Sequence, residues 1–345
     1  MKKSLLILLF TCWALFFAAF RPVMPFAAET AAFPDGTPVT GGRILMGTIG
    51  EPSNLIPYMA SDSASGEITG LLYVAPLKYD KDLNVVPWAA ASYEVLEGGR
   101  LLRFVLRDDI RWEDGVPLTA DDVEFTYKLM IDPKTPTAYS GDFLAIESFK
   151  KTGRLSFEVR YAKPFARSLM TWMGAILPKH VLEGQDIMTT PVARKPIGAG
   201  PYRLAKWDAG SMLTLTASDT YFEGRPNLDE VVYRIIPDPS TMFLELKAGK
   251  LDMMSLSPQQ YLRQTQGPQW ERDWRKYRYL SFSYTFLGFN LEHPFFKDVR
   301  VRRAISMAID RQSLIDGVLL GQGVPTVGPY KPGTWAYNDK LTPVR

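Results

Sequence analysis

Cysteine and histidine are nearly absent from this chain, which has one Cys and two His in 345 residues. A single Cys cannot form an intrachain disulfide, and one Cys with two separated His does not supply a structural zinc site. An excess of one charge sign is also missing, since the formal net charge is only +3. Lys2, Lys3 and Arg21 lie in the first 28 residues, which hold no acidic residue, so the remainder has 37 basic and 37 acidic residues. A neutral chain argues against nucleic-acid binding, which depends on neutralising phosphates.

Length and composition exclude wholesale disorder. Hydrophobic residues make up 46% of the chain and charged residues 22%, which is ordinary for a folded protein. At 345 residues the chain is long enough for two or three domains of roughly 100–200 residues each.

The motifs of several common enzyme classes are missing as well. The chain has no phosphate loop of the form GxxxxGK[ST], no GxSxG nucleophile elbow and no HExxH pair. The segment 198–201 (GAGP) has two glycines, but it lacks a third, and Pro201 removes an amide that a phosphate would need. A Ser-His-Asp triad would have to use His180, which we expect to begin a helix, or His293, which we expect in a turn before Pro294. We therefore predict that the protein is not an enzyme and holds no cofactor or metal.

One long hydrophobic run is present, at residues 5–20 (LLILLFTCWALFFAAF), directly after a basic start. Basic start, apolar stretch and small residues at 27–28 predict a secretory signal over residues 1–28 and a periplasmic location. Phe26 is bulky for a cleavage position, so an uncleaved membrane anchor stays open as the alternative. Thr11 precedes Cys12 where a lipoprotein site would have a small residue, so we interpret Cys12 as part of the apolar run. Residues 29–41 are small, polar and Pro-rich and are predicted to be a linker.

Hydrophobic alternation predicts several strands in the remaining chain. A short strand is expected at 42–47, and further strands at 213–217 and 231–236. In the strand expected at 101–107, Leu102, Phe104 and Leu106 share one side. Over 281–290 the aromatic residues alternate in the same way, which predicts a strand with one aromatic face formed by Phe282, Tyr284 and Phe286.

Capping residues predict three helices. Thr119 and Asp122 have the spacing of a capping box, which also accounts for the paired acids Asp121 and Asp122 without acid–base chemistry. A second helix is expected over 240–247, capped by Ser240 and stopped by Gly249. A third begins near Asp298 and carries apolar residues at helical spacing up to residue 309. Residues 322–345 are predicted to be coil.

Several segments resemble, in order along the chain, family 5 extracellular solute-binding proteins, the oligopeptide- and dipeptide-binding components of bacterial ATP-binding-cassette importers. No single segment is specific, but together, in this order and behind an export signal, they make the resemblance strong. It covers residues 42–330. The matching stretches are GTIGEPSNLIP at 47–57, VP at 86–87 with AAA at 89–91, LR at 106–107, WEDG at 112–115, LTADDV at 118–123, GAGPY at 198–202, AGKLD at 248–252, FN at 289–290, DVRVRRA at 298–304 and AIDR at 308–311.

The resemblance implies an α/β fold, the two-lobed clamp of a type II periplasmic binding protein with an inserted domain in its first lobe. Residues 42–57 and 195–269 would form the core of the first lobe, 58–194 the inserted α+β domain, and 270–345 the start of an incomplete second lobe. Because the family continues beyond this point, we expect a truncated gene or a fragment. In peptide-binding members, the aspartate that pairs with the ligand ammonium lies in that later part.

The resemblance also implies a function and a set of ligand-binding residues. The protein would be a monomer that captures small peptides between its lobes and delivers them to the permease subunits of the importer at the inner membrane. Glu51 and Ser53 would face the ligand in the loop after the first strand, and Tyr139 would line the peptide pocket. Tyr284 and Phe286 would contact the ligand on the strand that enters the second lobe, although strand alternation suits a core position equally well. Glu51 has the alternative of being solvated or capping a helix.

Other functions stay open at this point. The same fold could bind a nickel chelate, haem, an opine or an oligosaccharide. A secreted hydrolase would need a nucleophile and base that the sequence does not show. A periplasmic chaperone or a sensor subunit is the third alternative. We expect Trp112, Asp114 and residues 298–303 to serve folding through turns and caps, and Asn290 to be a structural hydrogen-bonding residue.

Overall fold

The computed structural model describes residues 38–334 and 336–342. These divide into two compact units, one ending at Ser255 and the other beginning at Leu256. The predicted signal over 1–28 and the predicted linker up to residue 37 lie outside the described residues, and residues 38–40 are exposed and irregular. Within the described ranges, no helix combines the length and apolarity needed to cross a bilayer.

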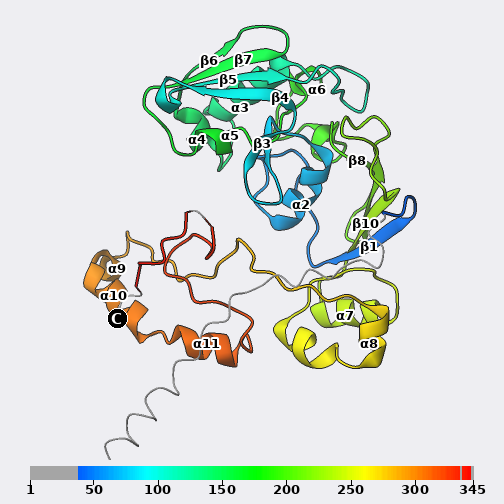
Figure 1. Cartoon of the computed structure of the whole chain (residues 1–345), viewed down its shortest axis with the longest axis vertical. Coiled ribbons are helices and arrows are strands. Elements are labelled where there is room, and N and C mark those ends of the chain that lie inside the picture. Colours follow the sequence, from blue (N-terminus) through cyan, green and yellow to red (C-terminus); the bar gives the residue numbers. More distant parts are fainter. Residues whose placement is uncertain (1–37, 335, 343–345) are drawn as a thin grey trace, which may run out of the picture. The chain divides into compact units, whose positions relative to one another are not determined.

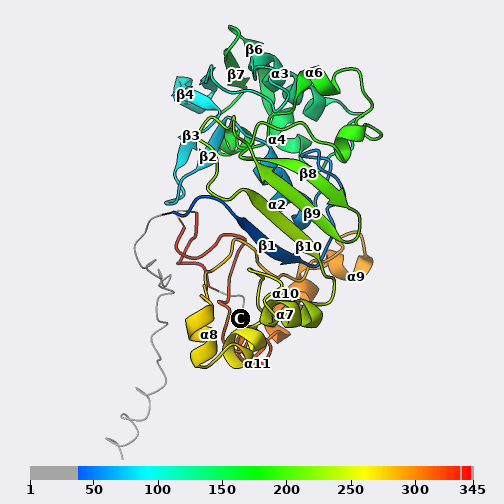
Figure 2. The same ribbon diagram turned by 90° about the vertical axis from the view of Figure 1, so that its right-hand side faces the viewer.

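The first unit is built on a mixed four-stranded sheet (Figures 1 and 2). Its strands run in the order β1 (Arg43–Thr48), β10 (Glu230–Ile235), β9 (Met212–Ala217) and β8 (Tyr202–Asp208). β1 is parallel to β10, and the other neighbours are antiparallel. This confirms the strands predicted at 42–47, 213–217 and 231–236. Helix α2 (Ser63–Leu72) packs against β8.

A second, antiparallel sheet comes entirely from residues between β1 and β8. Its order is β4 (Ala90–Leu96), β5 (Leu101–Leu106), β7 (Ser156–Tyr161) and β6 (Ile146–Lys151). Leu102, Phe104 and Leu106 are at most 2% exposed, so the predicted alternation of β5 is confirmed. Strands β2 (Leu77–Tyr79) and β3 (Val85–Pro87) form a hairpin beside it. One continuous hydrophobic core joins residues of both four-stranded sheets.

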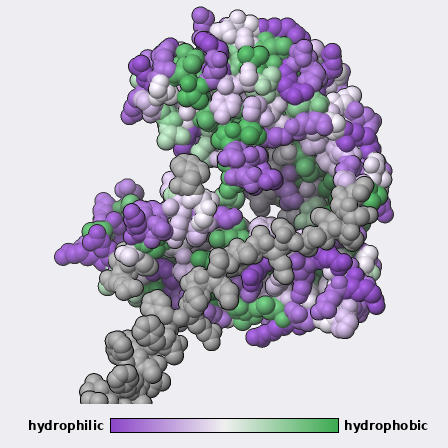
Figure 3. All heavy atoms as spheres, viewed as in Figure 1, coloured by the Kyte–Doolittle hydropathy of each residue, from purple (hydrophilic) through white to green (hydrophobic). Residues whose placement is uncertain are grey.

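Aromatic stacking fills the centre of the second sheet. The rings of Phe104 and Phe157 stack at 4.8 Å, and Phe157 lies 5.3 Å from Trp172. Arg103 on the outer face pairs with Glu94 and Glu158 on the neighbouring strands, at 2.9 and 3.0 Å. Hydrophilic and hydrophobic residues are interspersed over this part of the surface in Figure 3.

Helix α3 (Ala120–Ile131) begins with the predicted capping box. The Thr119 hydroxyl accepts from Asp121 N, and the carboxylate of Asp122 accepts from Thr119 N at 2.8 Å. Asp122 is 4% exposed and also accepts from the backbone amide of Lys179, which begins α6 (Lys179–Leu182). Asp122 therefore fixes two helix N-termini at once, while Asp121 pairs with Lys151 at the surface. Neither carboxylate is free for acid–base chemistry.

The remaining helical segments of the first unit are short. They are a 3₁₀ turn at Glu97–Gly99, α4 (Ser140–Leu144), α5 (Ser168–Thr171), a 3₁₀ turn at Pro191–Ala193 and α7 (Pro239–Lys247). α7 confirms the helix predicted over 240–247, but its predicted cap is wrong. Asp238 caps it, by accepting from Thr241 N, and Pro239 supplies the first helical residue in place of the predicted cap Ser240. Gly249 follows the helix with φ +71°, as a stop residue should.

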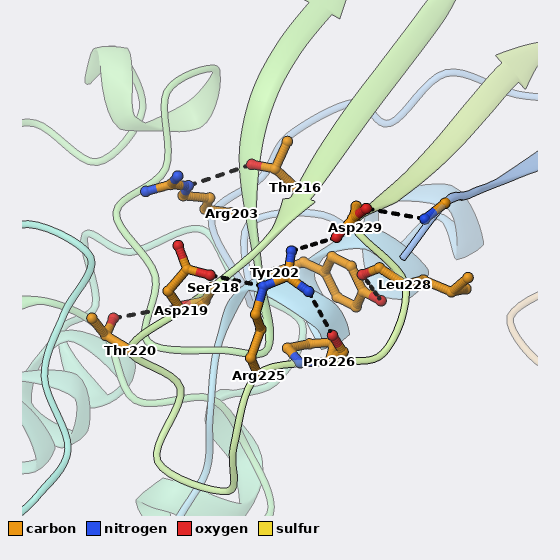
Figure 4. Close-up of polar contacts among 11 residues, drawn as sticks. Tyr202, Arg203, Thr216, Ser218, Asp219, Thr220, Arg225, Pro226, Leu228 and Asp229 are labelled. Atoms are coloured by element: carbon orange, nitrogen blue, oxygen red, sulfur yellow. Dashed lines mark hydrogen bonds and ion pairs between the residues drawn. The ribbon is translucent and has the colours of Figure 1, made fainter. Parts of the chain in front are cut away.

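An arginine closes the loop between β9 and β10. Figure 4 shows Arg225 between Asp219 and Asp229, with N–O distances of 2.8 and 2.5 Å. Asp229 also accepts from the backbone amide of Gly42, at 3.0 Å. The loop is thereby tied to the start of β1, which aligns β1 on β10.

The glycine-rich segment at 198–201 owes its glycines to close backbone packing. Gly200 N donates to the carbonyl oxygen of Leu72, the last residue of α2, at 2.9 Å. A Cβ added at Gly198 or at Gly200 would lie less than 3.0 Å from backbone atoms of residues 71–72. This contact leaves no room for a side chain, which is the physical reason for the motif.

The second unit is helical and otherwise irregular. It contains a π-helical turn at Gln260–Gln264, α8 (Pro268–Asp273), α9 (Pro294–Lys297), α10 (Val299–Ala308) and α11 (Arg311–Gly317). α10 confirms the predicted helix, with Asp298 accepting from Arg300 N, although none of its residues is buried. His293 lies in the expected turn and also caps α9, by accepting from Phe295 N.

The strand predicted at 281–290 is wrong. Within the part of the chain that the structure describes, this segment forms no ladder with another strand. Phe282, Tyr284 and Phe286 are 63%, 46% and 72% exposed, so the core alternative for Tyr284 and Phe286 is wrong too. Alternation alone does not make a strand when no neighbour supplies hydrogen-bond partners.

We predict that Gly198→Ala lowers the free energy of unfolding by about 3 kcal/mol or more, because the added methyl group would overlap the Leu72 carbonyl. Urea unfolding of the purified protein measures this. The control is Gly141→Ala in α4, where the added Cβ meets no atom within 4 Å. Equal stability of the two variants would contradict the close packing at Leu72.

Candidate functional site

A cavity of about 360 Å³ opens on the first unit, which is within the range of roughly 300–1,000 Å³ that is typical of ligand pockets. Its walls are mostly apolar. They come from the loop after β1 (residues 54–60), one side and the end of α2 (65–75), Trp88, Tyr139 and the turn 173–175. The α2 end that packs against Gly198 and Gly200 is thus also a wall of this cavity.

Tyr58 holds an unusual conformation at the cavity wall. Its φ is +73°, a value that is costly for a bulky residue and is often found where a ligand binds. Two hydrogen bonds hold it: its hydroxyl donates to Ala175 O, and its carbonyl accepts from Thr137 Oγ1, both at 2.8 Å. Burial raises the pKa of its phenol. Tyr139 meets its ring edge-on, with centroids 6.1 Å apart.

Trp88 forms another part of the wall and is fixed from behind by a polar network. Its indole Nε1 donates to Tyr221 Oη at 2.9 Å and to Glu223 Oε2 at 3.1 Å. Tyr221 also donates to Glu223, at 2.6 Å, and Lys78 pairs with the other oxygen of this carboxylate at 2.6 Å. These bonds lower the pKa of Glu223 against the opposing effect of its partial burial. The loop between β9 and β10 therefore positions a wall of the cavity.

Tyr73, at the end of α2, is the buried aromatic residue of the site. It is 2% exposed, and its hydroxyl has no hydrogen-bond partner among the described residues. Burial is the main cause of its raised pKa, and the charge of Glu113 adds to it. An unpaired buried hydroxyl is costly.

Glu113 lies near Tyr73 and has a carboxyl group with a raised pKa. Burial raises the pKa of Glu113 to about 7, although the amide of Gly198 hydrogen-bonds the carboxylate and acts in the opposite direction. The backbone amide of Glu113 donates to Gly198 O at 2.9 Å. The residue therefore lies at the contact between the turn after β5 and the 198–200 segment.

Of the five predicted site residues, Tyr139 lines the cavity. Glu51 instead accepts from Trp207 Nε1 at 2.7 Å and from Gly210 N at 3.1 Å, which ties the loop after β1 to the β8–β9 turn. Arg194 lies 3.6 Å from Glu51 and stacks over the Trp207 ring at 3.9 Å. Glu51 is therefore neither simply solvated nor a helix cap.

Ser53 has a local partner too. Its hydroxyl donates to Asp62 Oδ2 at 2.5 Å, and Asp62 caps α2. Asn54, the next residue, does line the cavity, and its side-chain oxygen accepts from Ile56 N at 2.7 Å. Its side-chain NH₂ has no partner among the described residues, so it remains able to donate to a ligand.

Tyr284 and Phe286 belong to the second unit, where their ring centroids are 5.5 Å apart. Their exposure suits contact with a ligand, and their part in binding stays a prediction. Tyr58, Tyr73 and Trp88 were not predicted from the sequence. Asn54 and Tyr58 lie in or beside the family-like stretch 47–57, and Trp88 lies within the stretch 86–91, whereas nothing in the sequence near Tyr73 signals a pocket.

Neither a catalytic triad nor a metal cluster is formed by the described residues. His180 lies in the first turn of α6, in agreement with the prediction, and pairs with Asp114 at 2.7 Å, but none of the hydrogen bonds found there links it to a serine. Asp114 also forms the predicted turn, with Gly115 at φ +87°. Trp112 is 1% exposed, in agreement with its expected folding role. No group of three or more metal-ligating side chains occurs over the described ranges.

We expect Glu113→Gln to remove a pH dependence of stability. Since the folded pKa of about 7 exceeds the unfolded value, the protein loses stability as pH rises from about 4.5 to about 7 and does not regain it above. The Gln variant, which keeps an acceptor for Gly198 N, should be more stable than the parent at pH 8, by on the order of 1 kcal/mol after solvent screening, and equal to it at pH 4.

Urea unfolding across this pH range checks the sign. Glu245→Gln serves as the control. The hydrogen bond from Arg234 lowers the pKa of Glu245, so replacing this glutamate should make the protein less stable than the parent at pH 8. A Glu113→Gln variant whose stability tracks the parent at every pH would contradict the burial of this carboxyl.

Tyr73→Phe should raise the free energy of unfolding by about 1 kcal/mol in the absence of ligand, since it removes an unpaired buried hydroxyl. The matched variant Tyr202→Phe should lower it, because the Tyr202 hydroxyl donates to Leu228 O at 3.2 Å. Thermal unfolding of both proteins compares them. A loss of stability in Tyr73→Phe equal to that in Tyr202→Phe would show that the Tyr73 hydroxyl has a partner.

Comparison with known proteins gives consistent matches. The sequence profile of bacterial extracellular solute-binding proteins, family 5 (Middle), matches residues 84–345. The oligopeptide-binding protein AppA of Bacillus subtilis is 32% identical over 308 residues, which cover 88% of this chain and 56% of AppA. Protein XP55 of Streptomyces lividans is 31% identical over 310 residues, covering 88% and 55%. The chain thus spans about half the length of the curated relatives it matches.

Solved structures agree. The structure of B. subtilis AppA in complex with a nonapeptide matches with a TM-score of 0.79 and 31% identity, over 89% of this chain and 61% of that one. NikZ of Campylobacter jejuni in complex with Ni(L-His) matches with a TM-score of 0.71 and 26% identity, over 81% and 55%. The expected α/β fold, shared with periplasmic binding proteins, is confirmed for the part that this chain covers.

Proposed function

The chain belongs to the bacterial extracellular solute-binding proteins, family 5, and on this basis we propose that it is part of a receptor that captures peptides and delivers them to the permease of an ATP-binding-cassette importer. The observation that carries the proposal is the aromatic-walled cavity, found in a fold that matches a nonapeptide complex with a TM-score of 0.79. The protein binds its solute without changing it covalently.

The proposed domain arrangement follows the chain. Residues 42–57 and 195–269 are proposed to form the core of the first lobe, 58–194 the inserted domain, and 270 onward the second lobe; residues 256–269 fall in the second compact unit described above. The second sheet supports the insertion, because all its strands come between β1 and β8 in sequence. Lobe closure would remove water from the hydrogen bonds to the ligand, as in hinge-bending proteins.

Recognition of a peptide needs two kinds of contact. Backbone groups are the same in every peptide, so hydrogen bonds to them give affinity without reading sequence, and pockets read the side chains. The side-chain NH₂ of Asn54 has no partner among the described residues, so Asn54 is suited to hydrogen-bond the peptide backbone. The cavity is suited to hold a side chain. Tyr284 and Phe286 are proposed to add contacts from the second lobe. Glu51 and Ser53 act by holding the loop that carries Asn54.

Export and assembly complete the proposal. Residues 1–28 are proposed to direct the protein to the periplasm, where it acts as a monomer with the permease subunits as partners. A non-peptide solute is the alternative that the titrations below test, since NikZ, one of the matching structures, was solved in complex with Ni(L-His).

We predict that the purified chain binds short peptides of two to nine residues, with a change in tryptophan fluorescence and a higher melting temperature. At a ligand concentration 100 times the Kd, the stabilisation should be about 2.7 kcal/mol.

Tyr139→Ala should weaken binding at least fivefold. Tyr79→Ala is the matched control, because Tyr79 is similarly exposed (42% against 46%) and does not line the cavity.

Isothermal titration with the peptide panel, with nickel–histidine and with an opine separates the candidates. Flat titrations with all peptides and saturable binding of one of the other solutes would replace the peptide assignment.

A further inference from the structure

Two glycines interrupt α2 on the side that lines the cavity. Gly66 and Gly70 are four residues apart in a ten-residue helix, so they lie on the same face. Glycine is, after proline, the least favourable residue in a helix interior. Its presence at both positions therefore calls for a reason outside the helix.

Neither backbone conformation nor packing supplies that reason. Neither glycine has a positive φ, and a Cβ built at either position would meet no atom within 4 Å. Gly174, on another wall, differs, because a Cβ there would collide with the Tyr58 ring. Both glycines are exposed and line the cavity, so the absence of side chains at 66 and 70 leaves it open to solvent there.

The surroundings of this space define the chemistry of what would fill it. Rings of Tyr58, Tyr73, Trp88 and Tyr139 form its walls, and no charged side chain is among the described residues that line it. The hydroxyls of Ser65 and Thr69 are already bonded, to Asp62 and to the Ser65 carbonyl. A charged group would be buried without a partner, whereas a flat apolar group could stack on the ring faces and edges.

Two features mark the space as a binding pocket and not as a packing defect. Tyr58 keeps a strained backbone conformation at its wall, held by hydrogen bonds to segments far away in sequence. The buried hydroxyl of Tyr73 is left without a partner among the described residues. The backbone strain at Tyr58 and the unpaired hydroxyl of Tyr73 both destabilise the folded protein, and such features are often retained where a ligand binds.

We propose that the cavity receives one large apolar side chain of the bound peptide, aromatic in preference to aliphatic, and that Gly66 and Gly70 set the size of side chain it admits. This inference rests on the proposed function of peptide binding. It makes the two glycines specificity-determining residues, since a side chain at either position would occupy the space that the ligand side chain needs.

The test is a size exchange between protein and peptide. Peptides of six alanines, with each position in turn replaced by Trp, Phe, Leu or Lys, are titrated against the purified chain and against Gly66→Leu and Gly70→Leu. At one position of the peptide, Phe or Trp should bind at least tenfold more tightly than Ala, and Lys no better than Ala. In the leucine variants this preference should fall below threefold, while the all-alanine peptide keeps its affinity.

Control variants separate size from folding. Gly70→Ala should stabilise α2 and reduce the preference only in part, because a methyl group fills little of the space. Gly317→Leu adds the same side chain to a glycine in α11 that also has open space, and should leave the preference unchanged.

The outcomes are distinct. If peptides bind but the leucine variants keep the parental preference, or if Lys is preferred at that position, the inference is wrong and the proposed function stands. If no peptide binds the parent chain, the proposed function fails and this inference fails with it.

Discussion

The close passage of residues 198–200 along the end of α2 is the contact on which the first unit depends. The backbone of the segment that leads into β8 hydrogen-bonds the last carbonyl of α2 and leaves no space for a Cβ. Glu113, from the turn after β5, bonds to the same segment. Three stretches that are far apart in sequence are thereby held against each other, and the α2 end that they hold is a wall of the cavity.

The cavity shows how a folded protein retains open space despite the tendency of interiors to pack densely. Hydrogen bonds fix its walls: Trp88 is held from behind by Tyr221 and Glu223, and Tyr58 by Thr137 and by the carbonyl of Ala175 in the neighbouring wall. Rings that are held by polar bonds on their outer side cannot collapse inward. Glycines on α2 then leave the space between them empty, so affinity for a ligand group need not be reduced by a large rearrangement of the walls.

Charge takes little direct part in this site. The ionised groups nearby are engaged with other side chains or with the backbone: Glu51 accepts from the Trp207 indole and the Gly210 amide, and Glu223 pairs with Lys78. They stabilise the loops that carry the wall residues. No charged side chain is among the described residues that line the cavity, and Glu51, the charged residue singled out from the sequence, is not one of them.

Short-range sequence patterns account for the individual elements and for little of the site. The capping box at Thr119, the alternation of β5 and the start of α10 follow from interactions within a few residues, and each was predicted. The order of family-like segments was enough to predict the α/β fold. Of the five site residues predicted from the resemblance, Tyr139 alone lines the cavity.

Contacts between distant parts of the chain set everything else. Residues 281–290 have the pattern of a strand, but a strand exists only where a neighbour pairs with it. The sequence excluded a phosphate loop at residues 198–201, but it gave no reason for the glycines at 198 and 200, which is their contact with the Leu72 backbone. Tyr58, Tyr73 and Trp88 form one cavity only because the fold brings the loop before α2 and the residue after β3 to the end of α2, and no local pattern encodes such contacts.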